Sequence, residues 1–135
     1  MADCVFCDFV ATRRRHSQMV YEDDCVLAIL DDNPLAEGHT LVILKSHHPD
    51  LTTVSPTDAA EMGRSVARIG GALKAALGAE FIYIASIGEQ VRHVHFHLVP
   101  RYKGDAAGFG HFLSARTKLQ NGQAIAAKIK ACLPI

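Results

Sequence analysis

The sequence has no apolar run that approaches the roughly 20 residues a membrane-spanning helix needs, so we expect no membrane span. Its start, MADCVFCDFV, lacks a basic segment followed by an apolar stretch, which argues against a secretory signal. A formal net charge of +0 excludes a protein that holds nucleic acid by bulk electrostatics. Four cysteines are too few for a secreted disulfide framework. These absences favour a cytoplasmic protein.

The chain does contain enough apolar sequence to bury a core. Hydrophobic residues make up 49% of its 135 residues and charged residues 21%, a composition that excludes a disordered chain. The length is that of one domain, which we expect over residues 1–135. Short apolar runs predict strands at residues 19–21, 25–30, 40–44, 80–87 and 93–101, the third of them central and buried. A short turn at residues 88–89 would join the last two strands.

The sequence predicts fewer helices than strands. Ser55 followed by Pro56, with apolar residues at every third or fourth position afterwards, predicts one long helix that ends near Gly78. Residues 4–12 suit a short helix or a knuckle, residues 102–122 are irregular, and residues 123–133 have the composition of a terminal helix. The expected fold class is therefore α+β: a mostly antiparallel sheet of about five strands, one long helix and a C-terminal helix.

Three of the eight histidines alternate with apolar residues in the segment HVHFHLVP. On a strand, His93, His95 and His97 share one face, while Val94 and Phe96 face the core. Neighbouring histidines on that face lie roughly 6.6 Å apart, so each can serve a different role. Imidazole can attack phosphorus, move a proton or bind a metal at neutral pH, and its chemistry alone leaves these roles open.

The segment HVHFHLV resembles the histidine triad of the HIT superfamily. Further segments look like HIT sequences in the same order: YEDD at residues 21–24, LDDNP at 30–34, GHTLVI at 38–43, KSH at 45–47 and PRY at 100–102. The likeness covers residues 1–103 of the HIT-like domain, and residues 104–135 form a variable tail. It implies a nucleotide hydrolase or nucleotidyl transferase that forms a nucleotidyl-histidine intermediate. It also implies a homodimer in which two sheets join into one.

The resemblance also implies roles for individual residues. His95, the middle histidine, would be the nucleophile, and His97 would bind the phosphate or the leaving group. His39 would form a hydrogen bond within the triad and help to fix the tautomer of the attacking ring. Asp31 would bind the ribose hydroxyls, with Leu30 flanking the base. The substrate implied is a purine nucleotide.

The loop before the triad departs from the family pattern, because it is shorter. Glu89 stands where the family has glutamine, and Gln90 where some members have serine or threonine, so either is a candidate for assisting the leaving group. Arg92 and Arg101 are candidate phosphate neighbours. In the tail, His111 is a further candidate for the leaving-group pocket.

Cys4 and Cys7 form a C-x-x-C pair whose spacing suits two thiolates on one tetrahedral zinc ion. A thioredoxin-like redox pair is the alternative, but that motif belongs near a βαβ unit. HIT members with an N-terminal C-x-x-C resemble this sequence, and they imply that His47 and His93 complete a structural zinc site. His48 is the alternative to His47.

Three hypotheses follow. The first is a hydrolase that cleaves nucleoside phosphoanhydrides or phosphoramidates by attack of His95 on phosphorus. The second is a zinc-stabilised nucleotide-binding module with little or no turnover. The third is a hydrolase in which His93, His95 and His97 activate water on zinc, which the poor convergence of side chains on one flat strand disfavours.

Overall fold

The structure is a computed structural model that describes residues 4–134. Its helices and strands follow one another as α1 (Val5–Thr12), β1 (Met19–Glu22), β2 (Val26–Leu30), β3 (Thr40–Leu44), α2 (Pro56–Leu77), β4 (Phe81–Ala85), β5 (His95–Arg101), α3 (Phe109–Phe112) and α4 (Gly122–Ala131). Short 3-10 helices lie at His16–Gln18 and Leu51–Thr53. In the part of the chain just given, none of the helices combines the length and the apolar composition that crossing a membrane would take.

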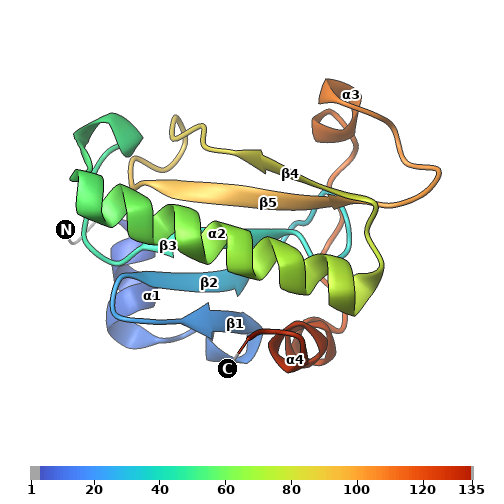
Figure 1. Ribbon diagram of the computed structural model, residues 1–135, viewed down its shortest axis with the longest axis horizontal. Coiled ribbons are helices and arrows are strands. Elements are labelled where there is room, and N and C mark those ends of the chain that lie inside the picture. The colour runs from blue at the N-terminus through green and yellow to red at the C-terminus, as the bar shows by residue number, and fades with distance from the viewer. Residues whose placement is uncertain (1–3, 135) are drawn as a thin grey trace.

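The strands form one antiparallel sheet in the order β1-β2-β3-β5-β4. The expected α+β class, with five strands, one long helix and a C-terminal helix, is confirmed. β3 lies at the centre of the sheet and all of its residues are buried, as its β-branched composition predicts. Figure 1 shows α2 lying across one face of the sheet, α1 behind the other face and α4 beside β1.

Each face of the sheet buries its own apolar cluster. On the α2 face, residues such as Ile69 and Leu73 pack against alternate strand residues such as Val42 and Leu98. On the α1 face, Phe6 and Phe9 pack against the strand side chains that point the other way. These are Met19, Leu27, Ile29, Leu41 and Ile43. The α1 face also carries His95 beside Phe6, so the strand alternation separates the histidines from the larger core.

The long helix begins and ends at the predicted residues. The Ser55 hydroxyl accepts a hydrogen bond from the Asp58 amide at 3.2 Å, and Pro56 occupies the first turn, where its missing N–H leaves no bond unmade. Gly78 ends the helix at φ 72°, a left-handed conformation that glycine adopts without strain. Local sequence therefore fixes both ends of α2.

The connection between β4 and β5 differs from the short turn expected at residues 88–89. It spans residues 86–94, and β5 begins at His95 rather than at His93. The reason is the hydrogen bonding of Val94. Its amide donates to the carbonyl of His48, a residue beyond the end of β3, at 2.8 Å, so Val94 does not pair with β4. The irregular segment 102–122 also contains the short helix α3, which was not predicted.

Candidate functional site

His95 opens β5 and points to the α1 face, where it is 5% exposed. Its Nδ1 lies 2.7 Å from the His93 carbonyl oxygen. A carbonyl can only accept, so Nδ1 carries the ring hydrogen and Nε2 keeps its lone pair. Burial lowers the pKa of His95 below its usual value, which keeps the ring neutral near pH 7. The arrangement holds an unprotonated, nucleophilic nitrogen on this face.

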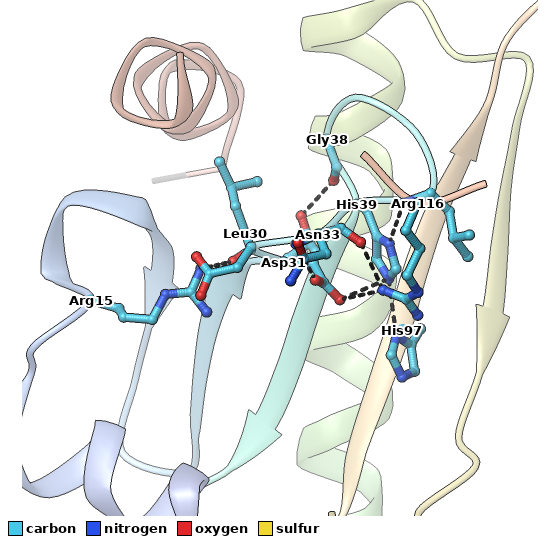
Figure 2. Close-up of polar contacts among 11 residues, drawn as sticks. Arg15, Leu30, Asp31, Asn33, Gly38, His39, His97 and Arg116 are labelled. Atoms are coloured by element: carbon cyan, nitrogen blue, oxygen red, sulfur yellow. Dashed lines mark hydrogen bonds and ion pairs between the residues drawn. The ribbon is translucent and has the colours of Figure 1, made fainter. Parts of the chain in front are cut away.

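A second backbone group sets the tautomers of His39 and His97. The Leu35 amide donates to His39 Nδ1 at 3.1 Å, so the hydrogen of a neutral His39 ring is on Nε2. That Nε2 lies 2.9 Å from His97 Nδ1, which must therefore accept. The hydrogen of His97 is left on Nε2, the nitrogen that faces away from His39 (Figure 2).

Both of these rings are neutral at physiological pH. Burial lowers the pKa of His39 to about 4, although Asp31, whose carboxylate oxygen lies 3.6 Å from His39 Nε2, acts in the opposite direction. Burial also lowers the pKa of His97 to about 4, and the next cause is the repulsion between His97 and His95 when both rings are protonated. The His39–His97 pair is thus a relay of fixed tautomers that presents a neutral N–H donor, not a cation.

His95 and His97 open onto a cleft of about 810 Å³. Its walls come from α1, the ends of β2 and β3, the loop before β5 and the C-terminal segment. They are formed by Phe6, Asp31, Asn33, Leu41, Ile87, Gly88, Glu89, Gln90, Val91, His95, His97 and Arg116. The structure therefore brings together the two histidines with Asp31, Glu89 and Gln90, which the sequence singled out separately.

Asp31 lines this cleft from the loop that follows β2. Its Oδ1 accepts a hydrogen bond from the Asn33 amide at 2.8 Å. Its Oδ2 faces Arg116, whose Nη1 lies 3.3 Å away and also donates to the Asn33 carbonyl at 2.8 Å. Figure 2 shows Arg116 reaching toward Asp31 beside His39 and His97. The sequence does not reveal Arg116 as a site residue, because no motif links it to residues so far away in the chain.

Other candidates lie outside the cleft. Leu30 is 1% exposed and packs in the core on the α2 face, so it does not flank the cleft, and Leu41 provides apolar wall there instead. His111 is buried, and its Nε2 lies 2.8 Å from the Pro100 carbonyl. Arg101 lies over the Phe81 ring, 5.0 Å from its centroid, at the β4 side of the sheet. Arg92 is exposed and is not among the residues that line the cleft.

A second cluster lies where α1 meets the loop after β3. The donor atoms of Cys4, Cys7, His47 and His93 all lie within 4.8 Å of one another. Sulfur and nitrogen are 3.2 Å apart between Cys4 and His93 and 3.4 Å apart between Cys7 and His47, and the two Nδ1 atoms are 3.2 Å apart. A tetrahedral zinc ion would hold such pairs roughly 3.5 Å and 3.3 Å apart. The geometry fits zinc.

The chemistry of the four donors also fits a cation. The Nε2 of His93 lies 2.5 Å from the Leu44 carbonyl, so its hydrogen is there and the Nδ1 lone pair faces the cysteines. Burial raises the pKa of the Cys7 thiol, with Cys4 as the next cause, and a bound cation would reverse this by stabilising thiolate. His48 is not in the cluster, which selects His47 of the two neighbouring histidines.

Asp31, His39 and His97 also converge closely enough to share an ion. However, the nitrogens that face each other already form a hydrogen bond, because His39 Nε2 carries a hydrogen directed at His97 Nδ1. A metal ion on His39 Nε2 would require a hydrogen on Nδ1, where the Leu35 amide already donates. His39 and His97 are therefore a hydrogen-bonded pair beside Asp31 rather than part of a metal site.

A fold and a row of histidines of this kind define the histidine triad class, and comparison with known proteins agrees. The sequence model of the HIT domain matches residues 12–104. An uncharacterized HIT-like protein of Borreliella burgdorferi is 41% identical over 116 residues, which cover 81% of this chain and 83% of that protein. The chain belongs to the HIT domain family.

Two further relatives bear on the site. Adenylylsulfatase HINT3 of Arabidopsis thaliana is 37% identical over 108 residues, which cover 76% of this chain but only 54% of that protein. The crystal structure of a Zn-bound histidine triad family protein from Mycobacterium smegmatis superposes with a TM-score of 0.82 and 33% identity. The superposition covers 97% of this chain and 93% of that one, so the likeness in fold extends over the tail.

Proposed function

We propose that the protein is a hydrolase that cleaves nucleoside phosphoanhydrides or phosphoramidates, with purine nucleotides as substrates, through a nucleotidyl intermediate on His95. The observation that supports it best is the tautomer of His95, because the His93 carbonyl accepts from Nδ1 and leaves the Nε2 lone pair free on the cleft side. A neutral imidazole held in this way is a nucleophile ready for phosphorus.

The reaction has two steps. In the first, His95 Nε2 forms a bond to the α-phosphorus while the bond from phosphorus to the leaving group breaks, and the leaving group departs with that electron pair. A phosphate leaves as the anion, whereas the amine of a phosphoramidate takes up a proton as it leaves. In the second step, water attacks phosphorus and gives up a proton to solvent while the bond to Nε2 breaks. This step releases the nucleoside monophosphate and returns His95 to its neutral form. No oxidant or reductant is required.

The other cleft residues position the substrate. His97 donates from Nε2 to a phosphoryl oxygen, and His39 holds it in that tautomer through the 2.9 Å contact. Asp31 accepts from the ribose hydroxyls. The loop that carries Glu89 and Gln90 also lines the cleft, and the leaving group departs beside it in this proposal.

Zinc, in this proposal, is structural. Bound by Cys4, Cys7, His47 and His93, it would supply no reaction chemistry, because four protein ligands leave it no open position. The part these residues play is to hold α1 against the start of β5. His93 thereby places its carbonyl oxygen 2.7 Å from His95 Nδ1, which connects the metal cluster to the orientation of the nucleophile.

We further propose a homodimer formed along β4, the edge strand next to β5. Large apolar side chains are exposed on this strand, with Phe81 at 50% and Ile84 at 54%, and Ile87 in the loop just after it is 64% exposed. An exposed apolar edge strand readily pairs with another strand, and a second copy of the same edge would extend the sheet.

The test is hydrolysis of adenosine phosphoramidate, of a diadenosine polyphosphate and of adenylyl sulfate, the last suggested by the name of the Arabidopsis relative. We expect wild-type turnover of at least one of these compounds, a loss of at least about 100-fold in His95→Asn, and no change in His16→Asn, a matched change at an exposed histidine.

Full activity in His95→Asn would refute the mechanism. Tight nucleotide binding without turnover by the wild type would instead favour a binding module. The observation behind that second candidate is Glu89, whose carboxylate lines the cleft and would repel a leaving phosphate.

A further inference from the structure

The cleft that is proposed to bind a nucleotide has little positive charge. Among the described residues that line it, Asp31 and Glu89 are acidic, and Arg116 is the sole lysine or arginine. His97 does not compensate, because burial lowers its pKa to about 4 and leaves it neutral at pH 7. A phosphate entering this cleft would meet two carboxylates and one guanidinium, so its binding depends on Arg116.

Arg116 is held over the cleft by a specific attachment of the C-terminal segment. The Thr117 amide donates to the Pro34 carbonyl at 3.1 Å, and the Leu119 amide donates to the Asp32 carbonyl at 2.8 Å. These bonds lay the segment along the loop that carries Asp31, and they place the guanidinium beside Asp31 Oδ2 (Figure 2). Arg116 lies outside the residues 12–104 that match the HIT domain, so this placement belongs to the tail of this chain.

The contact between Arg116 and Asp31 is easily exchanged. The Arg116 side chain is 47% exposed and its Nη1 lies 3.3 Å from the carboxylate, a geometry in which an ion pair contributes little. A phosphate carries more charge than a carboxylate and accepts two parallel hydrogen bonds from a guanidinium. A nucleotide can therefore draw Arg116 away from Asp31 without a large penalty.

We propose that Arg116 is the cationic phosphate-binding residue of the cleft, acting beside the neutral donor His97, and that it releases Asp31 when it binds the phosphate of a nucleotide. This proposal rests on the proposed function. Asp31 thus holds the guanidinium near His97 while the cleft is empty, and its Oδ2 becomes free for the sugar when the phosphate arrives. Arg116 would thus determine the preference of the cleft for nucleotides over nucleosides.

The experiment compares the affinities for AMP and adenosine by calorimetry on the full-length protein. The two ligands differ only in the phosphate, so the ratio of their affinities isolates the phosphate contact. We expect Arg116→Gln to weaken AMP binding by about 10-fold or more and to leave adenosine binding unchanged. Arg116→Lys should retain part of the preference. The control is Lys118→Gln. Lys118 lies two residues after Arg116 and carries the same charge, but its side chain does not line this cleft.

Each outcome has a definite meaning. An unchanged ratio in Arg116→Gln would overturn the proposal. Equal weakening of AMP and adenosine would also overturn it, because it would make Arg116 a support for Asp31 and not a phosphate ligand. Failure of the wild type to bind either compound would refute the proposed function itself, and this inference with it. Binding of adenosine with no preference for AMP would leave the nucleoside site standing and refute the role of Arg116 alone.

Discussion

The neutral state of His39 makes a quantitative prediction about pH and stability. Burial lowers the pKa of His39 to about 4 in the folded protein, against 6.5 for the free side chain. Between pH 6.5 and pH 4, His39 is protonated in the unfolded chain but not in the folded protein. The free energy of unfolding therefore falls as pH drops below 6.5 and levels off near pH 4. With these two values, the loss between pH 7 and pH 5 is about 2 kcal/mol.

The assay is urea denaturation at pH 7 and pH 5 for the wild type and for His39→Asn, both with zinc present. Asparagine keeps an acceptor for the Leu35 amide but cannot take up the proton. Other titrating groups, including the metal cluster, are present in both proteins, so the difference between the two pH dependences reports the loss of His39 and of its contact with His97. We expect the wild type to lose about 2 kcal/mol more than the variant.

Equal losses in the two proteins would refute the reasoning. That result would mean that the folded protein accepts a proton on His39, with the Asp31 carboxylate 3.6 Å away outweighing burial. The relay to His97 would then carry a charge, and the assignment of its tautomers would fail.

Three further changes test other parts of the structure. Cys4→Ser should lower the zinc content measured by atomic absorption and the melting temperature, while Cys132→Ser, an exposed thiol outside the cluster, should change neither. Gly38→Ala should destabilise the fold by about 1–2 kcal/mol in urea denaturation, because φ is +89° and the end of the Leu77 side chain must move to make room for a Cβ. Gly63→Ala, in open space on α2, should be neutral or stabilising. Phe81→Asp should convert a dimer to a monomer in light scattering.

Each of these three predictions has its own contradicting result. Zinc retained at full stoichiometry by Cys4→Ser would contradict the four-ligand site. A Gly38→Ala protein as stable as the wild type would contradict the left-handed backbone conformation of this turn. A dimer that survives Phe81→Asp would move the interface away from β4.

Much of the fold was predictable because local signals coincide with the tertiary structure. Ser55, Pro56 and Gly78 mark the two ends of the long helix, and the same residues cap α2 in the structure. Alternation in HVHFHLV predicted one face for the histidines, and β5 places His95 on the α1 face and Leu98 in the core opposite. The four residues expected at the metal site lie together in the structure. The resemblance to the family predicts that they converge, whereas their spacing in the sequence does not.

The rest depended on contacts that leave no local pattern. β2 is apolar at every position and buried throughout, so its sequence does not reveal which face Leu30 takes. Arg116 reaches Asp31 through backbone bonds between the tail and the loop after β2, in a segment without periodicity. The His93 carbonyl that orients His95 is a backbone group, which no motif of side chains records.

The most direct test of the central claim is to trap the intermediate and locate it. Wild-type protein mixed briefly with adenosine phosphoramidate and quenched should carry one covalently bound adenylyl group, which peptide mass spectrometry should place on His95. His95→Asn should carry none. An adduct on His97 or on another residue, or turnover by the wild type with no adduct at any mixing time, would contradict the account.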